Sequence, residues 1–268
     1  MEELTGRTPP EMQRELGELV YKDPSGAWEV ADTYLSGNVR EKLKDAEAAA
    51  TSDPAYQRNV EALQKVQPKD LEPSEIDARL GASWIPPSDV AEFVRAVLDM
   101  RADIAYAEPI ATWTLTPRGY RESVANTQTY GTARYYADEL IRDALNLKVP
   151  TVYDYVGAGA DRTQVVNVQE TTAAREQQQK LKDEFKGWLW KDGARAERLG
   201  RKYNDERNNI RLPTFDGSHL TLAGSNPAIT LRPHQKDAIW RGVSSPSHLL
   251  LAHVVGAGKT FEMAGIAM

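Results

Sequence analysis

The sequence predicts an α+β fold in three regions, divided near residues 80 and 220. Residues 1–80 are rich in charged residues and alanine, residues 81–220 alternate β-rich and helical segments, and residues 221–268 contain an apolar run followed by a glycine-rich turn. These patterns predict an acidic helical arm, a mixed α/β central domain that acts as a connector, and an incomplete α/β unit at the carboxyl end.

In the arm, helices are expected at residues 9–20 and 38–66, because Pro9 and Pro10 suit a helix start and the text A-E-A-A-A favours helix. Two prolines in residues 67–76 should interrupt the second helix, and a helix should resume to about Leu80. The arm is acidic, since residues 1–80 carry 10 Lys+Arg against 17 Asp+Glu, whereas the remaining residues carry 23 against 22.

The central domain is expected to start near Gly81 with a helix in W-I-P-P-S-D-V-A-E-F-V-R-A-V-L. Ser88 or Asp89 suits its amino-terminal cap. One apolar face follows from the helical spacing of Val90, Phe93, Val94, Val97 and Leu98. The next segment, residues 104–115, is rich in β-formers and interrupted by Pro109, which predicts a strand or hairpin at a sheet edge.

Further along the central domain, residues 130–146 are expected to be helical, and residues 149–156 and 164–168 to form two strands. The glycines between these strands, Gly157 and Gly159, are typical of a turn and are assigned no phosphate-binding role. Two helices should follow, at residues 169–190 and 194–209.

Within the second of these helices lies a stripe of basic residues, Arg195, Arg198 and Lys202, at helical spacing. A local stripe of this kind is a weak candidate for docking on nucleic-acid phosphates. The favoured interpretation is a solvated helix face, because acidic residues are interleaved with the basic ones and mixed charge is common on exposed helices.

Near the carboxyl end, an apolar strand-like run breaks into a glycine-rich turn in L-L-L-A-H-V-V-G-A-G-K-T, residues 249–260. A strand, a glycine turn and a Lys-Thr pair together are typical of a Walker A phosphate loop. Glycines let backbone N–H groups turn inward onto phosphates. The sequence therefore predicts an ATP–Mg²⁺ site in which Gly256, Ala257 and Gly258 wrap the phosphates, Lys259 contacts the β- and γ-phosphates and Thr260 ligates Mg²⁺.

A second signal precedes the loop, in L-R-P-H-Q, where Pro233 should open a helix. Gln235 lies 24 residues before Lys259. A side-chain amide both donates and accepts hydrogen bonds, which suits recognition of the adenine edge. Gln235 is therefore a candidate for contacting the base, and the resemblance described next implies this role for Gln235 with Arg232 in support.

These residues resemble superfamily 2 helicases, above all the Swi/Snf-like translocases, in which L-R-P-Y-Q is followed by L-A-D-E-M-G-L-G-K-T. Here the corresponding texts are L-R-P-H-Q and L-A-H-V-V-G-A-G-K-T, with His253 in place of the aspartate. Other segments resemble large phage and mobile-element proteins that join an adenine-specific DNA methyltransferase to a helicase, namely T-Y-L-S-G-N-V-R-E-K-L, V-Q-P-K-D-L, R-L-G-A-S-W-I, T-Y-G-T and F-D-G-S-H.

This resemblance implies a region leading into the first RecA-like motor domain of an antirestriction or DNA-modification protein, with DNA and the flanking methyltransferase and motor domains as partners. The acidic pair that such motors use for hydrolysis is not found in the eight residues after Thr260, and no Pro-Pro-aromatic methyltransferase motif is present. We therefore expect a fragment that binds ATP without turning it over. The alternative is a non-catalytic connector or partner-binding module.

Composition bears on membrane association, cellular location and metal binding. No apolar run approaches the roughly 20 residues that span a bilayer, and M-E-E-L-T-G does not resemble a signal peptide, so we expect a cytoplasmic protein without a membrane partner. The chain has no cysteine, and its four histidines lack common metal-ligand spacing. Metal catalysis by protein ligands is therefore not predicted.

Overall fold

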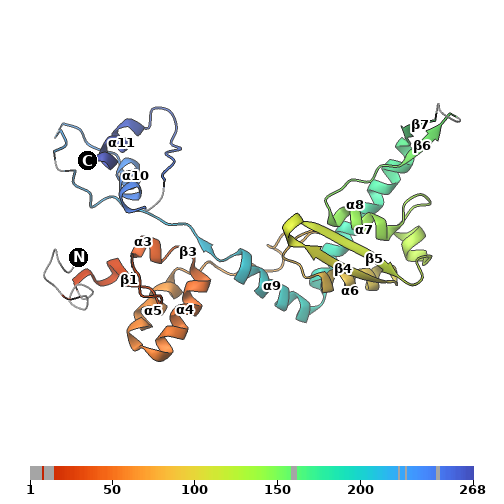
Figure 1. Ribbon diagram of the computed structural model, residues 1–268, viewed down its shortest axis with the longest axis horizontal. Helices are drawn as coiled ribbons and strands as arrows, with labels where there is room; N and C mark the ends of the chain where they lie inside the picture. The colour runs from red at the N-terminus through yellow and green to blue at the C-terminus, as the bar shows by residue number, and fades with distance from the viewer. Residues whose placement is uncertain (1–7, 9–14, 158–161, 223, 227, 246–247) are drawn as a thin grey trace. The chain divides into compact units, whose positions relative to one another are not determined.

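The computed structural model describes residue 8 and residues 15–157, 162–222, 224–226, 228–245 and 248–268 (Figure 1). Helices alternate with two-stranded antiparallel sheets among these residues, which confirms the predicted α+β class. The chain divides into two compact units: Lys69–Asn208, and Met1–Pro68 together with Asn209–Met268. The first begins before Gly81 because the Asn204 side chain exchanges two hydrogen bonds with the backbone of Leu71.

The amino-terminal part of the second unit is a small helical cluster. Tyr34, Val39 and Leu63 are almost fully buried in its core. The strand β3 (Gly37–Asn38) pairs antiparallel with β8 (Ile210–Arg211), which ties this cluster to the later segment of the same unit. The other elements are β1 (Val20–Lys22), β2 (Trp28–Val30), α3 (Ala31–Tyr34), α4 (Val39–Ser52) and α5 (Gln57–Lys65).

Three expectations for the arm were wrong in detail. The helix predicted over residues 38–66 is broken, because α4 ends at Ser52 and Asp53 caps a short 3-10 helix that starts at Pro54. No helix forms up to Leu80; Ile76, Ala78 and Leu80 are buried, and the residues between them are exposed, in a segment of turns and irregular backbone. The helix predicted over residues 9–20 is helical over most of its described part, since residues 15 and 16 are α-helical and Gly17–Leu19 is a 3-10 helix, but Val20 starts β1; residues 9–14 lie outside the described residues.

The unit Lys69–Asn208 contains the predicted hairpins and the two long helices predicted after them. The expected hairpin around residues 104–115 is confirmed, with Pro109 in its turn and with Arg101 opposite Arg118 in its antiparallel register. The two later strands and the two helices after them also form, although the first strand begins at Tyr153 and not at Val149, and residues 158–161 of the intervening turn lie outside the described residues. The elements are α6 (Pro87–Leu98), β4 (Arg101–Ala107), β5 (Thr112–Arg118), α7 (Ala137–Leu145), β6 (Tyr153–Val156), β7 (Thr163–Val166), α8 (Val168–Lys191) and α9 (Gly193–Arg207).

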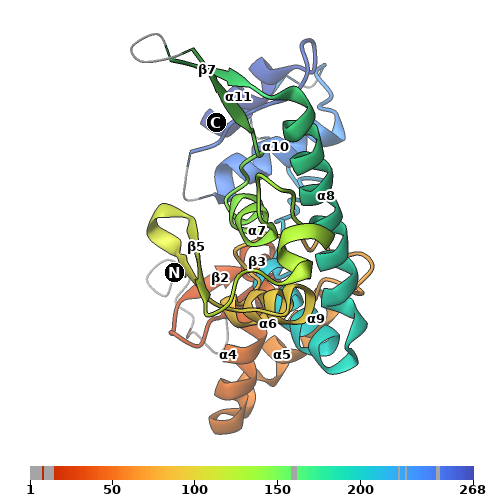
Figure 2. The same ribbon diagram turned by 90° about the vertical axis from the view of Figure 1, so that its right-hand side faces the viewer.

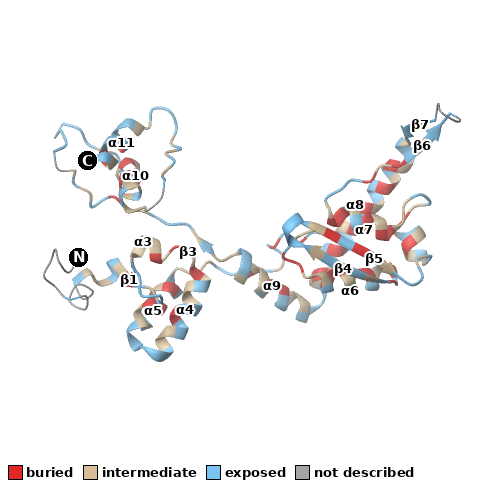
Figure 3. Ribbon diagram, viewed as in Figure 1, coloured by how far each residue is buried: buried red, intermediate tan, exposed pale blue. Residues whose placement is uncertain are grey.

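The core of this unit lies where α6, α7 and α8 meet the β4–β5 hairpin (Figures 2 and 3). The predicted apolar face of α6 is confirmed, since Val90, Phe93, Val94 and Leu98 are buried. The cap prediction was wrong, because Pro86 occupies the cap position and Asp89 is buried. The helix expected over residues 130–146 starts only at Ala137.

The late start of α7 has a local cause. A Cβ on Gly131 would lie 2.2 Å from the backbone oxygen of Asn126, so this stretch follows a tight irregular path. The Asn126 side chain is fully buried and accepts from the backbone N–H of Asp138 at 2.8 Å. This bond takes over part of the capping at the start of α7.

The carboxyl-terminal segment contributes α10 (Pro233–Ser244) and α11 (Lys259–Ala267). The helix predicted to open at Pro233 is confirmed. The strand expected at residues 249–255 is not formed: none of the described residues pairs with it, and Leu250, Val254 and Val255 remain 79–98% exposed. Among the residues the structure describes, no helix combines the length and apolar character needed to cross a membrane.

A candidate phosphate-binding loop

The backbone after Val254 has the shape that its glycines predict. Gly256 and Gly258 have φ angles of 85° and 92°, a region that only glycine enters at little cost. The N–H of Ala257 donates to the carbonyl of Val254 at 3.2 Å, closing the turn. Gly258 is the N-cap of α11, whose first N–H groups have no intrahelical acceptor. The loop thus presents a helix amino terminus suited to an anion.

Lys259 and Thr260, the residues predicted to bind phosphate and Mg²⁺, lie at this terminus. Lys259 is the first residue of α11 and donates from Nζ to the carbonyls of His253 at 2.9 Å and Val254 at 3.2 Å. Its ammonium is therefore held against the beginning of the loop, where phosphate oxygens would compete with these two carbonyls. Thr260 follows in the first turn and is exposed.

Gln235 contacts the loop directly, although 22 residues separate it from its partner. Its Nε2 donates to the carbonyl of Ala257 at 2.9 Å, and its Oε1 accepts from the backbone N–H of Arg232 at 2.9 Å. The side chain is buried on α10, whereas Arg232 is exposed at the N-cap of that helix. Gln235 therefore anchors the loop, and its amide keeps one donor and one acceptor capacity for another partner.

A pocket of about 400 Å³ lies between α10 and the apolar run. The guanidinium of Arg241 lies 5.8 Å from the centre of the Phe215 ring beside it. The pocket is lined by Pro213, Phe215, His234, Asp237, Ala238, Arg241 and residues 249–253, and Gln235 is not among these residues. The structure thus brings Gln235 to the glycine-rich loop and not to this pocket.

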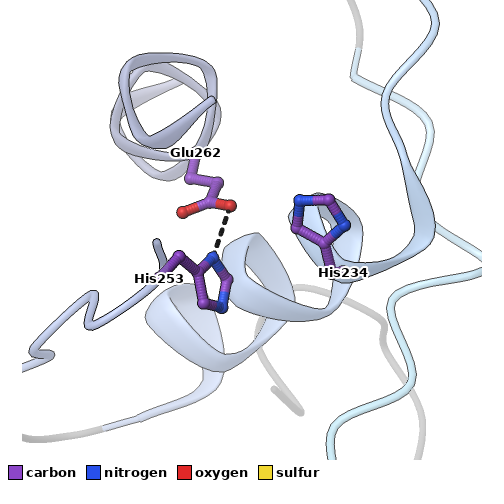
Figure 4. A group of neighbouring side chains, drawn as sticks. All are labelled: His234, His253 and Glu262. Carbon is purple, nitrogen blue, oxygen red and sulfur yellow. Dashed lines mark hydrogen bonds and ion pairs between the residues drawn. The ribbon is translucent and has the colours of Figure 1, made fainter. Parts of the chain in front are cut away.

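A group of side chains that the sequence spacing did not indicate lies beside the loop (Figure 4). His253 Nδ1 is 2.8 Å from Oε1 of Glu262, which is fully buried on α11. His234 Nε2 is 3.1 Å from the carbonyl of Ala257. The three residues come from separate segments, so no local sequence motif predicts that they meet. The one signal in the sequence is a single acidic residue, Glu262, in the otherwise apolar segment F-E-M-A-G-I-A-M.

The basic stripe on α9 is engaged within its own unit. Arg195 donates to the carbonyls of Trp188 and Leu189, and Lys202 pairs with Glu206 one turn away. Arg198 pairs with the buried carboxylate of Asp89, and this hydrogen bond raises the pKa of its guanidinium. These contacts give the three residues local roles in packing and charge pairing.

The Arg198→Ala variant is expected to lower the free energy of unfolding by about 1–2 kcal/mol. Removing one partner of a fully buried pair costs roughly 3–5 kcal/mol, but the Arg198 side chain is half exposed, so solvent screens part of the effect. Lys202→Ala on the same helix should change the free energy of unfolding by less than about 0.5 kcal/mol. Urea unfolding of the full chain measures both, and equal effects would contradict a specific role for the Asp89 pair.

Comparison with known proteins gives a partial match. No curated protein and no solved structure matches the chain. Residues 79–209, which include α6 to α9 and precede the loop, are similar to the family model described as a domain of unknown function, DUF8437.

Proposed function

We propose that this chain binds ATP–Mg²⁺ through the loop at residues 256–260 and supplies that site to an ATP-dependent DNA helicase or translocase. The observation that carries the proposal is the hydrogen bond from Gln235 Nε2 to the carbonyl of Ala257. Two motifs that the sequence places far apart meet at one turn. A glycine-rich turn that binds no ligand does not need a hydrogen bond from a buried glutamine to fix its position.

In the proposed complex, the phosphates bind at the amino terminus of α11, where the helix dipole favours negative charge. The Lys259 ammonium moves from its two carbonyl partners to the phosphate oxygens, and Thr260 Oγ1 ligates Mg²⁺. Gln235 keeps the loop in place and uses its remaining amide capacity on the base, near Arg232. The RecA-like character of this segment, DNA as a partner and the link to DNA methylation rest on the resemblance to Swi/Snf-like and methyltransferase–helicase proteins.

The test is an equilibrium titration of the full chain with fluorescently labelled ATP, in Mg²⁺ and in EDTA. We expect saturable binding to one site that weakens when Mg²⁺ is removed. Thr260→Val keeps the side-chain shape but loses the hydroxyl, so it should lower the affinity about tenfold in Mg²⁺ and have little effect in EDTA. Absence of saturable binding by the wild-type chain would overturn the proposal.

The second candidate function is a connector without nucleotide chemistry. It is favoured by the location of the family match, which covers residues 79–209 and excludes the loop. The unit Lys69–Asn208 also has its own hydrophobic core. On this view, the chain joins a modification domain to a motor, and the same titration separates the two functions because a connector does not bind ATP.

A further inference from the structure

His234, His253 and Glu262 form a compact group at one side of the loop. They come from α10, from the apolar run at residues 249–255 and from α11, respectively. One nitrogen of each ring and one carboxylate oxygen all lie within 4.8 Å of one another, and the two ring centres are 5.5 Å apart at an interplanar angle of 80°. Figure 4 shows the carboxylate facing His253, with the His234 ring on the adjacent helix.

An independent observation concerns the carboxylate of Glu262. Its side chain has no exposed area, Oε1 faces His253, and Oε2 is buried without a hydrogen-bond partner among the described residues. Burying a carboxylate oxygen without a donor or cation is costly, because the lost hydration of the charged group is not replaced. A cation bound by this carboxylate would offset part of that cost.

We propose that His234, His253 and Glu262 bind a divalent transition-metal ion of the Zn²⁺ class. Two imidazoles and one carboxylate are the donor set that Zn²⁺ and its neighbours prefer, whereas Mg²⁺ selects oxygen ligands alone. Three protein ligands leave a fourth position for water. The inference does not depend on nucleotide binding.

The proposed site needs the donor atoms to lie closer together than they do now. Metal–ligand bonds of about 2.0–2.1 Å in a tetrahedral site place donor atoms roughly 3.3 Å apart. Their present separation is at most 4.8 Å, so in the proposed complex the two rings turn toward the carboxylate. His253 Nδ1 already lies at 2.8 Å from Glu262, so the metal takes the place of this hydrogen bond.

The site would also stiffen the loop beside it. The backbone carbonyl of His253 accepts from Lys259 Nζ, and His234 Nε2 lies 3.1 Å from the carbonyl of Ala257. A metal held by these histidines therefore connects the start of the loop to α10, and Glu262 connects it to α11. Hydrogen exchange in the first turn of α11 is expected to slow when the metal binds.

The experiment titrates the full chain with Co²⁺ in the absence of nucleotide, reads the visible absorption of the ion and then displaces it with Zn²⁺. We expect one Co²⁺ per chain, with an intense low-symmetry spectrum. Each of His253→Ala, His234→Ala and Glu262→Gln should weaken binding at least tenfold. His248→Ala is the matched control, because His248 is exposed and outside the group.

Glu262→Gln keeps the shape of the buried side chain, so circular dichroism of this variant shows whether lost binding reflects lost folding. A wild-type chain that takes up no Co²⁺ would overturn the inference. So would uptake that is equal in His253→Ala and in His248→Ala, which indicates scattered surface binding. The assay contains no ATP, so its outcome is read separately from the nucleotide titration.

Discussion

The Lys259→Ala variant is expected to lose roughly 10–100-fold in affinity for MgATP. Hydrogen bonds to a charged group contribute about 1.5–3 kcal/mol, and each 1.4 kcal/mol is tenfold in affinity. The ammonium lies at the loop, 2.9 Å from the carbonyl of His253, and in the proposed complex it contacts the phosphate instead. The measurement is the labelled-ATP titration in Mg²⁺.

Lys236→Ala is the control for this variant. Lys236 lies on α10 next to Gln235, and its Nζ bonds the carbonyls of Ser218 and Leu220 and not the loop. The Lys236→Ala variant should bind ATP with the same affinity as the wild-type chain. Equal affinity in Lys259→Ala and the wild type would contradict the phosphate role, provided that hydrogen exchange in α11 shows the helix intact.

Much of the fold was predictable because its signals are local. The helix Pro87–Leu98 shows a buried face at helical spacing, and the β4–β5 hairpin shows β-formers on both sides of a proline turn. The errors lie where distant residues decide the conformation. Asp89 suits a helix cap by its type, yet its buried carboxylate pairs with the half-exposed guanidinium of Arg198, more than a hundred residues later.

The segment before Gly81 is a second place where distant residues decide the conformation. Ile76, Ala78 and Leu80 alternate with polar residues, a period of two that the helical interpretation overlooked. Gly81 itself has a φ of 91°, and a Cβ there would lie 2.4 Å from the carbonyl oxygen of Leu145. A tertiary approach of this kind leaves no trace in the neighbouring sequence beyond the glycine.

The local backbone geometry of the candidate loop was predictable from its residues, and its contacts were not. Glycines with positive φ and a lysine at the helix start follow from local sequence. The hydrogen bond from Gln235 to Ala257 and the meeting of His253 with Glu262 depend on how α10 and α11 pack. The run 249–255 has the composition of a strand but no strand partner among the described residues, so composition alone did not determine its conformation.

The Phe93→Ala variant is expected to lower the free energy of unfolding of the unit Lys69–Asn208 by about 3–5 kcal/mol. The Phe93 side chain is fully buried on α6. Its ring makes edge contacts with Phe185 at 4.9 Å and with Trp188 at 5.5 Å, so truncation loses both the buried area and the aromatic pairing. Urea unfolding followed by hydrogen exchange in α6 and α8 measures the loss within this unit.

Arg95→Ala tests whether the loss belongs to the core, because Arg95 is exposed on the same helix and its replacement should change the free energy of unfolding by less than about 0.5 kcal/mol. Two similarly small effects would mean that α6 does not pack on α8 through Phe93. The loop at residues 256–260 belongs to the other compact unit, so ATP affinity should stay unchanged in Phe93→Ala at temperatures where the chain remains folded. A parallel loss of ATP affinity in the folded variant would mean that the two units are energetically coupled.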